Sequence, residues 1–169
     1  MPSNIEIKAR VADPTRKREL AERLVQKPPT VLQQHDTFFP CTNGRLKLRE
    51  LSATEGELIF YRRPDTAGPR QSDYSIHPTN SPASLRALLT AAFGVGTVVV
   101  KTRLLYLVGE TRIHLDSVVG LGSFVELEVV LNPEQSAEEG RRVARDLMLA
   151  LEIDQADLID RAYADLLGA

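Results

Sequence analysis

Aliphatic and charged residues alternate in several stretches of this chain, and this alternation limits what the chain can fold into. The stretch RLKLREL, residues 45–51, alternates leucine with Arg45, Lys47 and Arg49, and the stretches NIEIKARV (4–11) and FVELEVVL (124–131) keep the same period. A period of two places the charged side chains of a strand on one face and the aliphatic ones on the other. The pattern therefore predicts half-buried strands, each with one ionic face.

The order of the expected elements indicates the α+β class with a mostly antiparallel sheet. Proline follows a capping residue at 13–14 and 81–82, which is typical of helix starts. We expect helices from 14 to before Pro28, from 82 to about 94, from 134 to about 151 and from 155 to 167. The expected strands are 4–11, 31–39, 45–51, 57–63, 73–78, 97–108, 111–118 and 124–131. No linker-like stretch divides the chain, so we predict a single domain over 1–169.

The composition excludes several classes of protein. With a net charge of −2, the chain has no global attraction for nucleic acid or anionic lipid. No segment approaches the roughly 18 apolar residues of a membrane span, and the N-terminus lacks a signal-peptide core, so a cytoplasmic location is expected. The single cysteine, Cys41, has no partner for a disulfide and no zinc-ligand spacing. The sequence leaves a homodimer possible.

The charges on the ionic faces are segregated by sign. Cations outnumber anions eight to four in these sets, although the whole chain is slightly acidic. Two interpretations remain open from this pattern alone: wet outer faces of a sheet, or faces that converge on one anion. The cations are Lys8, Arg10, Arg45, Lys47, Arg49, Lys101, Arg103 and Arg112, and the anions are Glu6, Asp116, Glu126 and Glu128.

Both kinds of side chain suit a polyphosphate and its counterion. Arginine and lysine bind phosphate oxygens through charge-assisted hydrogen bonds. Clustered carboxylates are hard oxygen ligands for Mg²⁺ or Mn²⁺. If the faces converge, the sequence predicts a compact, highly charged phosphate compound as the ligand, with a divalent metal.

The ordered motifs NIEIKARV, DTFF, GRLKLRE, ELIFYRRPDTAGPR, VVVKTR, TRIHLD and GLGSFVELEV resemble those of the CYTH family, the triphosphate tunnel metalloenzymes, and most closely its class IV adenylyl cyclase-like branch. The resemblance covers nearly the whole chain. It implies a closed antiparallel β-barrel of about eight strands, with helices packed outside and a charged lumen that holds a triphosphate.

The resemblance also implies roles for individual residues. Metal ligands would be Glu6, Asp116, Glu126 and Glu128. Catalytic residues would be Lys8, Glu126 and Glu128, with the general base left open between the two glutamates. Phosphate-binding residues would be Lys8, Arg45, Lys47, Arg49, Lys101, Arg103 and Arg112, joined by Arg63 or Arg62, and the ionic face of the first strand adds Arg10.

The first family motif departs from its usual pattern. The family places two glutamates before the lysine, but this chain has Asn4 at the first of these positions, so we expect a weakened or rearranged second metal site.

Three functions follow as hypotheses. The first is Mg²⁺- or Mn²⁺-dependent hydrolysis of a small-molecule triphosphate: tripolyphosphate, ATP or thiamine triphosphate. The second is class IV adenylate cyclase activity, which converts ATP to cyclic AMP and pyrophosphate. The third is a polyphosphate- or nucleotide-binding module without catalysis.

Overall fold

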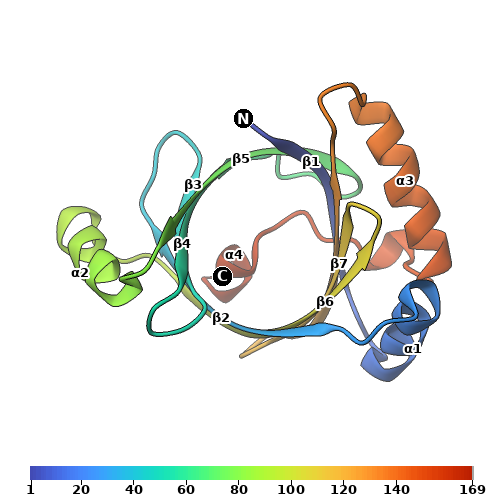
Figure 1. The fold of residues 1–169 in the computed structure, drawn as a ribbon, viewed down its shortest axis with the longest axis horizontal. Helices are drawn as coiled ribbons and strands as arrows, with labels where there is room; N and C mark the ends of the chain where they lie inside the picture. The colour runs from blue at the N-terminus through green and yellow to red at the C-terminus, as the bar shows by residue number, and fades with distance from the viewer. Residues whose placement is uncertain (169) are drawn as a thin grey trace.

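Eight antiparallel strands close into a barrel in the computed structural model, which describes residues 1–168 (Figure 1). The order around the barrel is β1-β5-β4-β3-β2-β6-β7-β8. This arrangement confirms the predicted closed barrel. The strands are β1 (Ser3–Arg10), β2 (Thr30–Phe39), β3 (Arg45–Glu50), β4 (Gly56–Arg62), β5 (Arg70–Thr79), β6 (Val98–Val108), β7 (Thr111–Val118) and β8 (Gly122–Val130).

The longer helices lie outside the barrel and a short one lies across its opening. Helices α1 (Pro14–Val25) and α3 (Ala137–Ala150) flank one side, and α2 (Pro82–Phe93) lies on the opposite side (Figure 1). After a 3₁₀ turn (Gln155–Asp157), helix α4 (Tyr163–Leu167) falls inside the outline of the ring when the barrel is viewed end on (Figure 1). None of the helices within residues 1–168 combines the length and apolar character needed to cross a bilayer.

The C-terminal part of the chain differs from the sequence expectation in two places. A continuous helix over 155–167 is wrong, because the backbone between the 3₁₀ turn and α4 binds β1 instead. The Ile159 amide donates to the Lys8 carbonyl at 2.9 Å, and Leu158 forms a β-bridge with Ala9. Helix α3 begins at Ala137 rather than near 134, because Ser136 and Glu139 form a reciprocal capping box.

The apolar faces of the strands point outward, toward the helices. Ile7, Ile113 and Leu127 are fully buried on the outer surface of the barrel and cluster with Leu147 and Leu151 from α3 and the turn that follows it. Burying these faces under helices removes them from water and is the main stabilising contribution. Because side chains alternate along a strand, the charged faces must then point into the barrel.

Gly140 marks the closest approach of α3 to the barrel. A Cβ atom at this position would lie 2.5 Å from Leu131 Cδ2 and 2.7 Å from Ile5 Cγ1. Ile5 is fully buried, and close-packed protein interiors contain few voids that could take up a displaced side chain. The glycine therefore allows the helix axis to approach the outer surface of β1 and β8 closely.

Candidate active site

A cavity of about 270 Å³ occupies the lumen of the barrel, and every strand contributes side chains to it. The C-terminal segment closes one end. Tyr163 lines the cavity there, its ring packs against Phe124 at 4.9 Å between centroids, and its hydroxyl donates to Asp116 at 2.7 Å. Arg45 anchors the same segment by a 2.7 Å ion pair with Asp165. The cavity is therefore deep and charged, with one end closed.

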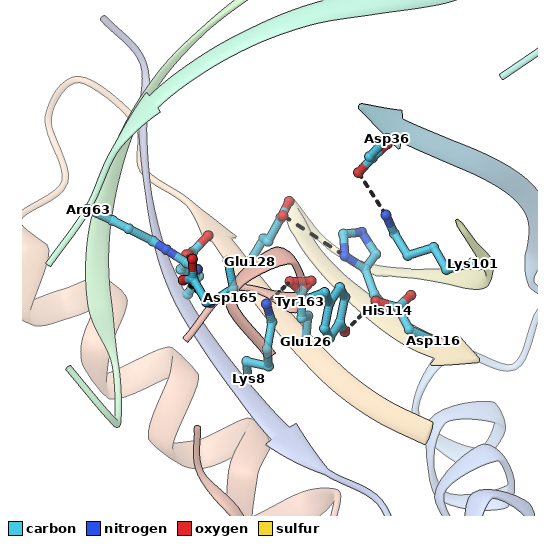
Figure 2. Close-up of polar contacts among 12 residues, drawn as sticks. Lys8, Asp36, Arg63, Lys101, His114, Asp116, Glu126, Glu128, Tyr163 and Asp165 are labelled. Atoms are coloured by element: carbon cyan, nitrogen blue, oxygen red, sulfur yellow. Dashed lines mark hydrogen bonds and ion pairs between the residues drawn. The ribbon is translucent and has the colours of Figure 1, made fainter. Parts of the chain in front are cut away.

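Adjacent strands β1 and β8 form a wall that carries carboxylates. Glu6 lies directly opposite Glu128 in the strand register, and Lys8 lies opposite Glu126. All four side chains line the cavity. Figure 2 shows Lys8, Glu126 and Glu128 pointing into the same space. The two central glutamates of β8 therefore face the lumen and not bulk water.

Each carboxylate on this wall is paired with a cation. Glu126 contacts Lys8 at 3.6 Å and Arg103 at 2.9 Å, and Glu128 contacts Arg112 at 3.2 Å. Glu6 pairs with Arg63, and Arg70 approaches it at 3.7 Å. Pairing of this kind offsets part of the cost of burying charge in the lumen.

A second wall, formed by β2, β3 and β6, carries cations around one acid. Asp36 accepts hydrogen bonds from Arg49 Nε at 2.9 Å and Nη2 at 2.8 Å. Its carboxylate also accepts from Lys101 at 2.9 Å, drawn as a dashed line in Figure 2, and from Lys47 at 3.3 Å. We refer to Asp36, Lys47, Arg49 and Lys101 as the Asp36 cluster.

Burial and neighbouring charges shift the pKa values of Glu126, Glu128 and His114 away from their usual ranges. Burial alone would raise the pKa of Glu126, but the charges of Lys8 and Arg103 outweigh it and hold that pKa well below its usual range. Burial, and then repulsion by Glu126, raise the pKa of Glu128. Burial also lowers the pKa of His114, whose Nδ1 lies 4.0 Å from Glu128 and has no hydrogen-bond partner within residues 1–168. The imidazole is therefore neutral near pH 7.

Two lysines in the lumen titrate close to neutral pH. Burial lowers the pKa of Lys8 to about 8, although Glu126 opposes the shift. Burial, together with repulsion by Arg49, lowers the pKa of Lys101 to about 7. Buried ammonium groups lose protons easily because a dry site stabilises their charge less than water does. An added anion would favour the charged form of both.

The oxygen donors of the β1 and β8 wall fit a divalent cation in their chemistry. Glu6, Glu126 and Glu128 supply carboxylates, and the side-chain oxygen of Asn4, buried on the same face of β1, has no hydrogen-bond partner within residues 1–168. Within that range no three acidic, histidine or cysteine side chains are already grouped as a metal site. Metal binding would therefore require the carboxylates to exchange cationic partners for the ion.

Three residues predicted for the site do not line the cavity, and of the alternatives Arg63 and Arg62 only Arg63 does. Arg10 is exposed, with its guanidinium 5.4 Å from the Phe124 ring centroid. Arg45 binds Asp165, as described above. Asp116 is buried, and Arg103 and Tyr163 engage both of its oxygens. The remaining predicted residues do meet in the cavity: Glu6, Lys8, Lys47, Arg49, Arg63, Lys101, Arg103, Arg112, Glu126 and Glu128.

The sequence interpretation missed two residues of the site. Asp36 lies in the strand stretch QQHDTFF, where its parity with Gln34 and Phe38 could have placed it in the lumen. Tyr163 offered no such signal, because its segment was expected to form an outer helix. Its ring lies 3.8 Å below Lys8 Nζ, a cation–π contact inside the cavity.

The fold and the site together define a class of protein: an antiparallel β-barrel whose charged lumen carries cations and carboxylates that face each other. The CYTH domain model matches residues 3–163, so the chain belongs to the CYTH family. This confirms the family resemblance of the sequence motifs.

Individual proteins resemble the chain in sequence or in fold. The chain is 26% identical over 143 residues to adenylate cyclase CyaB from Aeromonas hydrophila, covering 79% of this chain and 72% of that protein. The PH1012 protein from Pyrococcus horikoshii has the same fold, with a TM-score of 0.86, 22% identity and coverage of 96% of this chain and 98% of that one. HpAC1 from Hippeastrum, described as having a dominant triphosphatase activity, has a TM-score of 0.65 and 15% identity, with 99% of this chain and 94% of that chain covered.

Proposed function

We propose that the protein is a divalent-metal-dependent triphosphatase that acts on a small-molecule triphosphate, with tripolyphosphate, ATP and thiamine triphosphate as candidates. One observation carries the proposal: a cationic wall and a carboxylate wall face each other across one cavity that is closed at one end. A protein that bound only phosphate would need the first wall and not the second.

The cations of the lumen bind and orient the phosphate chain. Lys47, Arg49 and Lys101 approach from one side, and Lys8 and Arg63 approach from the carboxylate side. Arg103 lies on β6 but reaches Glu126 of the carboxylate wall. Charge-assisted hydrogen bonds in a site shielded from water are stronger than those on a surface. The fixed positions of these groups would hold the terminal phosphorus so that water can attack it in line with the leaving oxygen.

The carboxylate wall supplies the metal site and the proton acceptor. Glu6, Glu126 and Glu128 would hold Mg²⁺ or Mn²⁺, which neutralises phosphate oxygens and polarises the phosphorus when bound. We assign water orientation to Glu128, because Arg112 contacts only its Oε2 and leaves Oε1 with His114 at 4.0 Å. Water oxygen attacks the terminal phosphorus, the bridging P–O bond breaks, and Glu128 takes the proton. Lys8 and Arg103 neutralise the charge that remains on the leaving oxygen.

Adenylate cyclase activity is the second candidate. The Aeromonas hydrophila relative named adenylate cyclase supports it. The cavity also contains Leu32, Leu51, Ile76 and Leu105, which strand register places toward the end away from α4. These side chains offer an apolar surface for the base of a nucleotide.

One assay separates the candidates. Purified protein is incubated with Mg²⁺ or Mn²⁺ and each of the three triphosphates, and orthophosphate, pyrophosphate and cyclic AMP are measured separately. The triphosphatase proposal predicts release of one orthophosphate per turnover, together with ADP from ATP, thiamine diphosphate from thiamine triphosphate and pyrophosphate from tripolyphosphate, and loss of turnover when the metal is chelated. Cyclic AMP and pyrophosphate as the main products from ATP would establish the cyclase instead. Tight binding without any product, under either metal, would favour a binding module.

A further inference from the structure

The Asp36 cluster holds a negative charge at the centre of the proposed phosphate-binding wall. The Asp36 side chain is about 2% exposed, and three cations from two other strands contact its two oxygens at 2.8 to 3.3 Å. The charges of Arg49, Lys47 and Lys101 outweigh burial and hold the pKa of Asp36 well below its usual range. The carboxylate is therefore ionised at neutral pH.

An acid at this place is unexpected if the wall only attracts phosphate. The negative charge of Asp36 lowers the attraction of this wall for an anionic ligand. A neutral residue in its place would make the net positive charge of the wall larger by one. However, three buried cations repel one another, so without a counterion their side chains would spread apart and the two lysines would lose protons more easily. A fixed counterion opposes both effects.

We propose that Asp36 is a positioning residue, whose carboxylate holds Lys47, Arg49 and Lys101 together in the arrangement that receives the phosphate chain. The inference rests on the proposed triphosphate site. Asp36 engages Nε and Nη2 of Arg49, which leaves Nη1 for a ligand. Each lysine uses one of its three donors on Asp36 and keeps others for phosphate oxygens.

The surroundings of Lys101 explain why it depends most on Asp36. Burial and the nearby cations all favour the neutral amine, and Asp36 opposes them as the nearest acid. The Lys101 ammonium also lies 6.0 Å from the centroid of the Tyr163 ring. The charged or titratable groups that face it are Asp36 on β2, Lys47 and Arg49 on β3, Arg103 on β6, Glu126 on β8 and Tyr163 on α4.

The first test compares Asp36→Asn with Glu57→Gln. Glu57 also lines the cavity, on β4, but forms no ion pair within residues 1–168, so its variant removes the same charge without releasing a cation. We expect Asp36→Asn to lower kcat for the triphosphate by about tenfold to a hundredfold, while KM at pH 6 stays level or falls because an anion has been removed. Glu57→Gln should keep kcat. Equal effects of the two variants would overturn the positioning role.

The second test does not depend on catalysis. The side-chain ammonium of Lys101 is titrated by NMR in the ligand-free wild-type protein and in Asp36→Asn. The wild-type midpoint should lie near the pKa of about 7, and the variant midpoint should be lower by about one unit or more. An unchanged midpoint would overturn the inference even if the triphosphatase proposal holds. A protein without turnover but with the shifted midpoint would refute the triphosphatase and keep the positioning role.

A double variant covers the case in which Asp36→Asn alone folds poorly. Asp36→Asn combined with Lys101→Met removes one cation together with the anion and leaves the net charge of the cluster unchanged. If Asp36 acts partly through Lys101, the fold-loss of kcat in the double variant should be smaller than the product of the two single losses. If the Asp36→Asn single variant cannot be used, the kcat of the double variant should be close to that of Lys101→Met. Independent, multiplying losses, or a double variant far worse than Lys101→Met, would contradict the inference.

Discussion

Asp36 and Lys101 form a 2.9 Å ion pair in which both side chains are about 2% exposed, and this pair lies across the lumen from the carboxylates of β1 and β8. The lumen of the barrel thus contains both signs of charge on each wall. Burying unpaired charges in such an interior would lower the free energy of unfolding, so each charge needs a partner. The apolar contacts between the outer surface of the barrel and the helices therefore supply the main stabilisation of the fold.

Removing the Glu128 carboxylate should abolish turnover without unfolding the protein. We expect Glu128→Gln to lower kcat by about a hundredfold or more, since both metal binding and water orientation are assigned to this group. The raised pKa of Glu128 means that its ionised form is disfavoured in the folded state. A neutral isostere should therefore not lower the free energy of unfolding at pH 7.

Steady-state kinetics and urea denaturation check this prediction together. Glu110→Gln, an exposed acid in the turn between β6 and β7, serves as the matched control and should leave both quantities unchanged. Wild-type turnover in Glu128→Gln would remove Glu128 from the mechanism.

Triphosphate binding should weaken as the pH rises from 6 to 9. Lys101 and Lys8 have pKa values of about 7 and about 8, both lowered chiefly by burial. A bound anion favours their charged forms, so binding above these values must take up protons. For each such lysine, the affinity should fall by up to about tenfold per pH unit above its pKa.

Calorimetry across this pH range, compared between wild type and Lys101→Arg, isolates the contribution of Lys101. Arginine stays charged throughout, while the ionisation of the ligand is the same in both experiments. Superimposable pH profiles would show that Lys101 does not titrate on binding.

Adding a methyl group at Gly140 should destabilise the fold. Alanine favours a helix interior over glycine by up to about 1 kcal/mol, but its Cβ would overlap Ile5 and Leu131. Overpacking a rigid core costs about 1 to 3 kcal/mol, so we expect a net loss in the free energy of unfolding. Urea denaturation measures it, and Leu149→Ala, at an 81% exposed site on the same helix, should change stability by less than about 0.5 kcal/mol. A more stable Gly140→Ala variant would show that α3 can shift outward.

The Tyr163 hydroxyl should stabilise the closed end of the cavity. Tyr163→Phe keeps the ring under Lys8 but removes the 2.7 Å hydrogen bond to Asp116. We expect a loss of about 1 to 2 kcal/mol in the free energy of unfolding, since a buried carboxylate loses a donor. Tyr74→Phe is the control, because the Tyr74 hydroxyl has no hydrogen-bond partner within residues 1–168 and should contribute less than about 0.5 kcal/mol. Equal losses in both variants would contradict the role of the Asp116 contact.

The alternation of residues predicted much of the site. Glu6 and Lys8, or Lys47 and Arg49, share a strand face by period alone, and the structure places all four in the lumen. Arg10 and Arg45 have the same parity and yet lie outside it. Parity fixes which face of a strand a side chain occupies, but not whether that part of the strand reaches the cavity.

The sequence alone determined that these strands each have an ionic and an aliphatic face, because the two-residue period of a strand is a local property of the backbone. Only the tertiary structure decided which charges are paired, that Asp36 lies among three cations, and that Tyr163 reaches the lumen from the C-terminus. These contacts join residues such as Lys101 and Asp36 that lie 65 positions apart. Their positions depend on the closure of the barrel and the path of the chain, which no local pattern encodes.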